Sequence, residues 1–412
     1  MKYANRTSIV AGAVGAALSA AAFAADAPGD VINGVDVTLG ARASYDDNLY
    51  RLPDSIDPAL LAGPGATRSD FVQHGTVGLD GHWQWSRQKL LLYLNANSNR
   101  YEHNDQLDNT AGRGSLEWDW YASQFFSGKI GGDYNRSLAN FASTRFLEKD
   151  VLETTGAFAT FSFRLGPSWH LKTGGRHSET EHGAASRAFD NSRTNSVTAE
   201  LEYETSSDNT IGIQVRRSKA DFDSGLTLNG LLFDRDYTDE ALTLEIHQVF
   251  SPRTQLEVSG GYLKREYRDP MLAAIGKGSF KGGVGEFTLD WQATNKITLG
   301  FNGWRKLRAY LDAESDYFIA LGGSVAATWT PTDKIEVGLE TGYEKQEYLG
   351  ASVNLATDAR EDRVSSESLS IKYKPRRRLS FELTGRAENR NSDREVLGYD
   401  SRIASFGIRW TY

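Results

Sequence analysis

Charged side chains recur at every second position in segments whose other positions are apolar or small. In one such segment, Arg113, Glu117 and Asp119 alternate with Leu116 and Trp118. Fixed charges at this spacing can bind a polar solute or pair with one another. On a β-strand they share one face, because successive side chains point to opposite sides. The residues predicted to line this polar face, and so the lumen of a barrel, are Arg113, Lys129, Lys172, Arg176, Arg216, Glu202, Glu245, Glu257, Glu286, Glu340, Arg386 and Arg409.

Covalent and metal chemistry have little support in the sequence. It contains no cysteine, which excludes thiolate catalysis and thiolate metal sites. The seven histidines are scattered, and no Ser, His and Asp set can be assembled from spacing alone. His177 and His182 lie five positions apart, which on a strand turns them to opposite faces. We therefore predict no enzymatic activity, no catalytic residue, no metal site and no cofactor.

The charge balance restricts the partners. The formal net charge is −8 at pH 7, whereas nucleic-acid binding needs a basic surface, so no nucleic-acid partner is predicted. One basic cluster comprises Lys372, Lys374 and the three arginines at 376–378. It lies at a predicted turn and fits a solvated turn. Contact with anionic lipid headgroups or with a periplasmic protein is the alternative.

A second polar cluster lies at residues 45–51, which read Tyr-Asp-Asp-Asn-Leu-Tyr-Arg. The side-chain oxygens of Asp46, Asp47 and Asn48 could contact Ca²⁺. The rest of a calcium-loop pattern does not follow, and Asp and Asn are also common turn residues. We interpret the stretch as turn chemistry that ends a strand.

The elements that position these side chains repeat along the chain. A unit of two alternating strands around a tight polar turn recurs about every 36–45 residues. Aromatic residues precede the turns, as in 83–85 and 118–120, and long polar connections such as 46–69 and 349–362 separate the units. We predict an all-β, antiparallel up-and-down transmembrane barrel of about 18 strands, with short periplasmic turns and longer extracellular loops.

A secreted β-propeller is the main rival fold, because its blades repeat at a similar length. A propeller blade holds four short strands around an apolar core. Each repeat of this chain holds two longer strands, and one face of each strand is rich in charge, as at Glu286 and Asp290. Such a face has no core to join in a propeller, so the barrel is favoured.

The first residues predict export from the cytoplasm. Lys2 and Arg6 precede an apolar run over 9–22, and 22–24 reads Ala-Phe-Ala, which is the pattern of a cleavable signal peptide. We predict a signal peptide over 1–24, a short periplasmic segment over 25–33 and an outer-membrane barrel over 34–412. About ten residues then precede the first strand, too few for the plug domain of a TonB-dependent transporter.

The last strand carries alternating apolar residues that end on an aromatic: Phe406, Ile408, Trp410 and Tyr412. This ending resembles the signature that the barrel assembly machinery reads at the C-terminus of outer-membrane proteins. We predict that these four residues are the assembly signal and that the machinery is a partner. A barrel of about 18 strands has a radius of about 18 Å and leaves an aqueous channel.

Three features together carry a family resemblance: the stretch 45–51, the hairpin repeat with aromatic turns, and the ending 406–412. With them the mature chain resembles the β-barrel porins found with exopolysaccharide biosynthesis loci, including exosortase-associated exopolysaccharide transporters, in the outer membrane of Gram-negative bacteria. The resemblance implies a part in exopolysaccharide export, with outer-membrane lipid, exopolysaccharide and periplasmic export proteins as partners. A general diffusion porin and a non-conducting structural or adhesive barrel are the alternatives.

The resemblance assigns no binding residue. An acidic polysaccharide would need positive charge along the channel. Lys129, Lys172, Arg176 and Arg216 would form a positive track if they lie together, and the sequence predicts only that they share the inner face.

Overall fold

Eighteen strands form one closed sheet in the computed structural model, which describes residues 33–143, 147–205, 209–228, 231–269, 279–312, 315–349 and 360–412. Each strand pairs antiparallel with the next, and the last pairs with the first. The predicted all-β barrel of antiparallel strands is confirmed. The predicted signal peptide over 1–24 and most of the segment 25–33 lie outside the described residues. Among these residues no helix has the length and apolarity of a membrane span.

The strands of the barrel are β1 (Asn33–Asp46), β2 (Asp70–Trp85), β3 (Gln88–Tyr101), β4 (Asn109–Tyr121), β5 (Phe126–Leu138), β6 (Val151–Arg164), β7 (Trp169–His182), β8 (Ser192–Glu204), β9 (Thr210–Phe222), β12 (Tyr237–Ser251), β13 (Thr254–Tyr267), β14 (Ser279–Thr294), β15 (Ile297–Asp312), β16 (Ser315–Thr332), β17 (Ile335–Leu349), β18 (Glu361–Arg376), β19 (Leu379–Ser392) and β20 (Tyr399–Thr411). Outside the barrel wall lie a small ribbon and short helices: β10 (Leu226–Leu228), β11 (Leu231–Phe233), α1 (Pro58–Leu61), η1 (Asp105–Leu107), η2 (Phe141–Ser143), η3 (Ala185–Asp190) and η4 (Glu395–Leu397).

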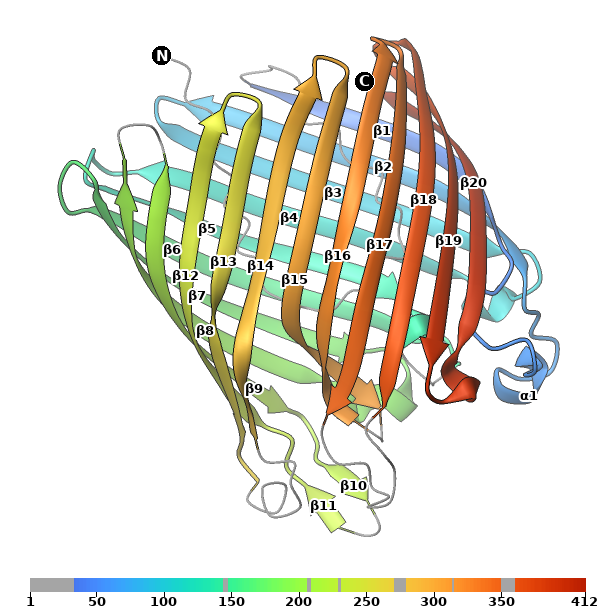
Figure 1. The fold of residues 1–412 in the computed structure, drawn as a ribbon. Coiled ribbons are helices and arrows are strands. Elements are labelled where there is room, and N and C mark those ends of the chain that lie inside the picture. The colour runs from blue at the N-terminus through green and yellow to red at the C-terminus, as the bar shows by residue number, and fades with distance from the viewer. Residues whose placement is uncertain are drawn as a thin grey trace.

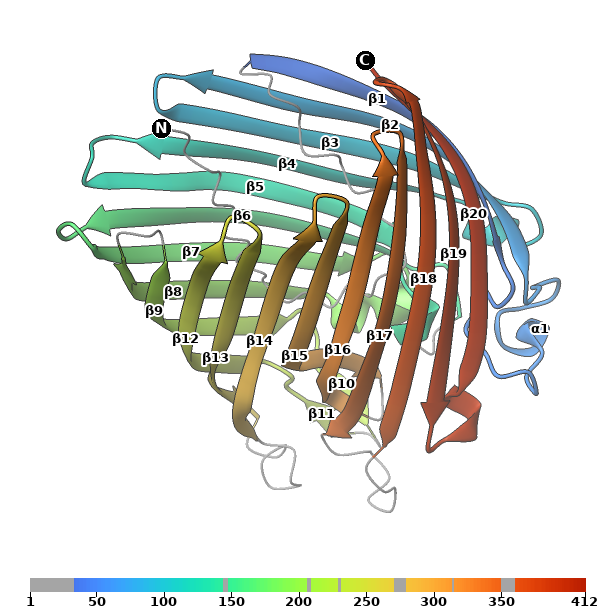
Figure 2. The same ribbon diagram turned by 45° about the horizontal axis from the view of Figure 1, so that its top comes forward.

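The two ends of the barrel differ in their connections. Figure 1 shows the short hairpin turns along the upper edge and the longer loops, with α1, β10 and β11, at the lower end. The chain enters β1 and leaves β20 at the turn edge. In transmembrane barrels the short turns are periplasmic and the long loops extracellular, so we call these the periplasmic and extracellular ends. Figure 2 shows β1–β9 and β12–β20 as two halves of a wall around one interior.

Alternation sets the two faces of the wall. On β14, Phe287 and Trp291 are each 44 % exposed, and the intervening Glu286, Thr288 and Asp290 point the other way because strand side chains alternate. We call the face with the exposed apolar side chains the outer face and the opposite one the inner face. Hydrocarbon covers the outer face in a membrane, and the polar inner face borders the lumen.

Aromatic rings gather beside the periplasmic turns. The ring of Trp120 lies 4.9 Å from that of Phe126, and the ring of Phe126 lies 4.8 Å from that of Phe163. Gly128 makes this packing possible, because a Cβ there would come within 2.2 Å of the Thr160 carbonyl oxygen and 2.6 Å of the Trp120 ring. Aromatic side chains at one height form the interfacial girdle of a membrane barrel.

Candidate functional site

The structure places the sequence-predicted lumen residues on inner-face positions of the wall. On each strand the predicted residue lies at one of the alternating positions that carry polar side chains. The other positions carry exposed apolar residues such as Trp118, Ile130 and Leu242. The placements are Arg113 on β4, Lys129 on β5, Lys172 and Arg176 on β7, Glu202 on β8, Arg216 on β9, Glu245 on β12, Glu257 on β13, Glu286 on β14, Glu340 on β17, Arg386 on β19 and Arg409 on β20.

The inner face of β4, β5, β7 and β8 is an ion-pair wall. The Lys129 Nζ lies 2.8 Å from a carboxylate oxygen of Glu117 and 3.4 Å from one of Asp119. The next pairs along this wall join Lys172 to Glu202 at 2.6 Å and to Glu200 at 3.6 Å, and Arg176 to Asp133 at 2.7 Å. These cations therefore meet carboxylates before they meet a solute.

The wall therefore does not offer the row of available positive charges that the sequence suggested for Lys129, Lys172, Arg176 and Arg216. Three of the four are paired with carboxylates on β4, β5 and β8. Within the part of the chain that the structure describes, the side chains of Arg216 and Arg113 make no ion pair or hydrogen bond. Single cations of this kind remain available to a solute in the lumen.

The remaining predicted residues lie at separate points around the wall. Glu286 pairs with Lys306, the Arg386 guanidinium donates to Glu388 at 2.8 Å, and Glu245 accepts from the Ser259 hydroxyl at 2.9 Å. The structure does not bring these groups together. It also shows a link between Glu344 of β17, Arg308 at 3.0 Å and the Trp304 indole at 2.7 Å, which sequence reasoning missed.

Hydroxyl and amide side chains line the inner face of the six neighbouring strands β18, β19, β20, β1, β2 and β3. On β2 and β3, the Thr76 hydroxyl donates to Asn97 at 2.6 Å, and the Asn97 amide donates to Asn95. Charged side chains stand among them, including Arg42 on β1, Asp80 on β2, Glu382 and Arg386 on β19 and Arg409 on β20. We call this surface the polar wall, and its residues are Ser366, Ser368, Ser370, Thr384, Ser405, Thr38, Thr76, Asn95, Asn97 and Asn99.

Sequence reasoning missed the polar wall because it searched for charge. The signal that could have revealed it is the run of asparagines at 95, 97 and 99, which share one face of a strand. The Asn99 carbonyl oxygen lies 2.8 Å from the His74 Nδ1, and its amide donates to Asn109 at 2.9 Å. These side chains are half-buried and already hold one another in place.

The stretch 45–51 organises a cover at the extracellular end. Asp46 bonds the Arg51 guanidinium at 2.9 Å, and the Asn48 amide donates to the Asp400 carbonyl at 2.7 Å. The oxygens are thus engaged within the protein, as the interpretation as turn chemistry expects. Among the described residues no group of three or more His, Asp or Glu could hold a metal ion.

Apolar side chains from three loops pack around Tyr50 of this stretch. The Tyr50 ring is 1 % exposed and lies 5.0 Å from the Phe141 ring of the β5–β6 loop. Arg390, on the inner face of β19, donates to the Ala142 carbonyl at 2.6 Å, so the β5–β6 loop reaches across several strands. The buried residues of this loop core are Tyr50, Leu52, Ala66, Leu107, Phe141 and Leu147.

The loops above β6 to β9 carry buried polar contacts of their own. His182, at the end of β7, lies 2.7 Å from Asp150, and both side chains are buried. Burial raises the pKa of Asp150, but hydrogen bonds from His182 and from the Ala184 amide outweigh it, so the pKa lies below its ordinary value. His177 lies on the outer face with Asn195. The two histidines therefore do not converge, as predicted.

The β15–β16 hairpin departs from the wall at its extracellular tip. The β14–β15 ladder ends at Gly285 and Arg305, whereas β13–β14 pairing continues to Ser279 and β15–β16 pairing to Asp312. Leu307 lies at an outer-face position of β15 but is only 9 % exposed. It is buried because it packs in a cluster with side chains at inner-face positions of β13 and β14. The tip therefore folds toward the lumen. The buried residues of this cluster are Leu263, Phe280, Leu307, Tyr317 and Ile319.

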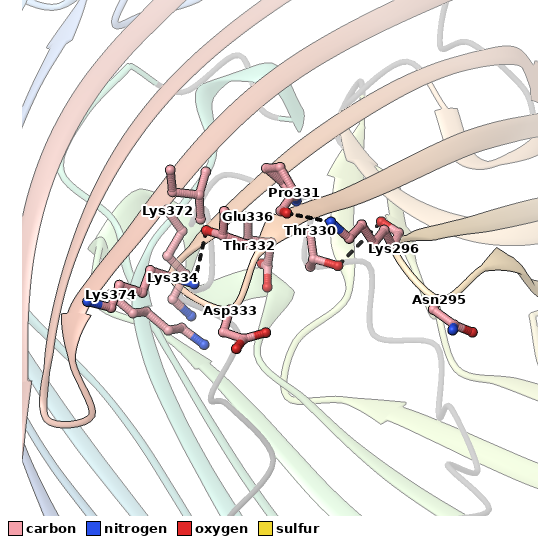
Figure 3. A pocket seen from close by; sticks show the side chains of 11 residues that line it. Asn295, Lys296, Thr330, Pro331, Thr332, Asp333, Lys334, Glu336, Lys372 and Lys374 are labelled. Atoms are coloured by element: carbon pink, nitrogen blue, oxygen red, sulfur yellow. Dashed lines mark hydrogen bonds between the residues drawn. The ribbon is translucent and has the colours of Figure 1, made fainter.

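A basic hollow opens at the periplasmic end, beside the turns that follow β14, β16 and β18. Figure 3 shows Lys334, Lys372 and Lys374 on one side of it and Lys296 on the other. Lys296 donates to the Pro331 carbonyl at 2.8 Å, which joins two adjacent turns. The predicted basic cluster at 372–378 is thus part of a larger basic surface than the sequence suggested.

The predicted assembly-signal residues lie together on the outer face of the last strand. Phe406, Ile408, Trp410 and Tyr412 are all exposed there, and the Arg378 guanidinium lies 4.8 Å from the Tyr412 ring. Their role as an assembly signal stays a prediction.

Comparison with known proteins decides the family. The family model described as "Putative beta-barrel porin 2" matches residues 39–412. The chain belongs to this family. It is therefore an outer-membrane β-barrel porin, as the resemblance implied, whereas the link to exopolysaccharide loci stays a prediction. A comparison with curated proteins finds no match.

Two solved structures are similar to this chain at low sequence identity. The structure of Pseudomonas aeruginosa OccK2 (OpdF) in complex with glucuronate is similar with a TM-score of 0.50 and 11% identity, over 92% of this chain and 98% of that one. The outer membrane protein OpdK of the same organism gives 0.49 and 12%, over 92% and 99%. At such identities the likeness to OccK2 concerns the fold alone.

Proposed function

We propose that this porin is a channel for hydrated saccharide chains and takes part in exopolysaccharide export. The observation that carries the proposal is the polar wall. Saccharides present hydroxyl groups that both donate and accept, and Asn, Ser and Thr side chains offer both functions without fixed charge. Six neighbouring strands supply such side chains on one continuous surface.

The ion-pair wall, which adjoins the polar wall where β3 pairs with β4, supports the same proposal in a different way. Because Lys129, Lys172 and Arg176 are paired, that wall is held by its own contacts and offers few unpaired charges to a saccharide. A chain that slides along a channel needs many weak contacts, so that it binds well enough to enter and weakly enough to leave. Partly satisfied hydroxyl and amide groups meet this requirement.

Conductance in a planar bilayer tests the proposal directly. Purified protein should form a channel that fragments of the host's own polysaccharide block when they are added to one side. Block by those fragments supports the proposal. An open channel that no saccharide blocks contradicts it, and a barrel without conductance points to a structural or adhesive role.

Removal of the gene tests the cellular role. Loss of the protein should lower the amount of cell-free polysaccharide, while expression of the intact protein from a plasmid restores it. Unchanged cell-free polysaccharide in a strain that normally makes abundant protein contradicts a part in export.

A second candidate function is diffusion of small solutes. The loop core around Tyr50 and the inward tip of the β15–β16 hairpin lie at the extracellular end, and narrowing of the channel by them would hinder a polymer more than a small sugar. Slower uptake of small sugars by the deletion strain, with polysaccharide secretion intact, would favour this candidate.

A further inference from the structure

The basic hollow at the periplasmic end carries an excess of positive charge. Four lysines and two carboxylates line its volume of about 600 Å³, which lies within the range of about 300–1,000 Å³ of ligand sites. Arg376 ends β18, and Arg377 and Arg378 form the turn to β19. We call its four lysines the lysine mouth: Lys296, Lys334, Lys372 and Lys374.

The largest group of positive charges on the periplasmic rim lies in one sector, and the β2–β3 and β12–β13 turns add only Arg87, Lys89 and Arg253. The turns after β4 and β6, at 122–125 and 165–168, contain no charged residue. Next to them the ion-pair wall neutralises its lysines. An anion that approaches the barrel from the periplasm therefore meets its strongest attraction at the lysine mouth.

Two of the four lysines belong to the lumen. Lys372 and Lys374 have inner-face parity on β18, where the outward Leu369, Ile371 and Tyr373 are exposed. Lys372 is paired in the ladder with Glu336 on one side and Glu382 on the other. A lipid headgroup or a flat protein surface cannot reach side chains on this face as readily as a chain that enters the pore. The position thus favours a ligand that threads into the barrel.

The lysine mouth also leads onto the polar wall. Lys374 and Lys372 lie on the same face of β18 as Ser370, Ser368 and Ser366. A saccharide chain held by charge at the rim would next meet hydroxyl groups on the same strand. A chain that carries both carboxylates and hydroxyls would thus meet lysines for its carboxylates first and serines for its hydroxyls next.

We propose that the lysine mouth binds the carboxylate groups of an acidic saccharide chain as the chain enters the barrel from the periplasm. This inference rests on the proposed function and names its substrate class. Lysine ammonium groups act as mobile, hydrated point charges. They attract successive carboxylates without fixing any one of them, which suits a chain that moves. The attraction is screened by salt.

The test uses the full-length porin in a planar bilayer with two probes, oligogalacturonate and maltoheptaose, added to one side at a time. The first carries carboxylates and the second is neutral. The variant is Lys334→Gln with Lys374→Gln. The matched control is Arg87→Gln with Lys89→Gln, which removes two positive charges at the β2–β3 turn of the same rim.

We expect oligogalacturonate to block from the periplasmic side more strongly than from the other. In the Lys334→Gln and Lys374→Gln variant the concentration for half block should rise about tenfold, as for the loss of two exposed charge contacts. The control variant should keep the wild-type value. Maltoheptaose block should be the same in all three proteins, which also shows that the variant barrel is intact.

An equal rise in both variants would overturn the inference, because the effect would then be one of overall charge. An unchanged half-block concentration in the lysine variant would overturn it as well, since the anion would bind elsewhere. In either case maltoheptaose block would leave the proposed function standing. If neither saccharide blocks an open channel, the proposed function itself fails.

Discussion

The two walls of the lumen face the same water with different chemistry. On the ion-pair wall, Lys129 lies against Glu117 and Asp119, so these charges are paired with one another. On the polar wall, Thr76, Asn97 and Asn95 pass hydrogen bonds along the surface and keep further donors and acceptors. The comparison teaches that the number of charges in a pore does not measure what the pore offers to a solute. Pairing decides it.

The largest effect is expected at the inward hairpin, which stands between the two walls. Leu307→Ala removes a packed side chain, and such a change costs about 2–5 kcal/mol of local packing. We expect the tip to leave its place and channel conductance to rise, while preference among saccharides stays the same. Leu321→Ala is the matched control, because Leu321 of the same hairpin is 52 % exposed. Equal conductance in both variants would show that the tip does not narrow the channel.

The ion-pair wall should respond in stability. Lys129→Met leaves Glu117 and Asp119 side by side without their cation, which should lower the free energy of unfolding by about 2 kcal/mol. Urea unfolding followed by tryptophan fluorescence measures the change. Adding Glu117→Gln to the variant should restore part of the loss. If it restores nothing, the pair does not support the wall, and the contrast between the walls disappears.

The polar wall should respond in binding. Asn95→Leu with Asn97→Leu removes amide groups that saccharide hydroxyls would use. We expect the concentration of maltoheptaose for half block to rise about tenfold, equivalent to about 1.4 kcal/mol. Gln214→Leu is the control, because Gln214 is an inner-face amide on β9, outside the polar wall. A similar rise for Gln214→Leu would mean that any amide in the lumen serves equally.

The smallest effect is expected at the loops above the ion-pair wall. The lowered pKa of Asp150 means that its carboxylate form stabilises the loop contact. This contribution is fully present above the ordinary value of 3.8 and is lost as the pH falls through the lowered pKa. Protease cleavage of the β5–β6 loop should therefore increase below about pH 4. Asp150→Asn should make cleavage high and nearly independent of pH. A wild-type loop that stays protected in acid would contradict the assignment.

The wall of the barrel could be predicted from the sequence because its signals are local. Alternation along 285–291 and a tight turn after Trp291 define a strand and its end without reference to other strands. The inner-face position of Arg113 or Glu340 follows from the same alternation. The length of the strands and the even repeat of turns then fix the closed sheet.

The contacts within the lumen could not be predicted, because they depend on register between strands. Arg176 meets Asp133, which lies 43 positions earlier and two strands away. A shift by one residue would have turned either side chain to the outer face. The inward tip of the β15–β16 hairpin escaped prediction for a related reason. Leu307 continues the alternation of its strand, and only the end of the β14–β15 ladder reveals the bend.

The closing pair of strands has a consequence for the order of events in the cell. The Val37 amide donates to the Tyr412 carbonyl at 3.0 Å, and the Tyr412 amide donates to the Val37 carbonyl at 2.8 Å. Of the eighteen strands, the one synthesised first thus waits for the one synthesised last. Until they meet, two unpaired edges remain open to other chains. Premature pairing of either edge with another chain would compete with closure of the barrel, so these two strands must be kept from other chains until the barrel closes.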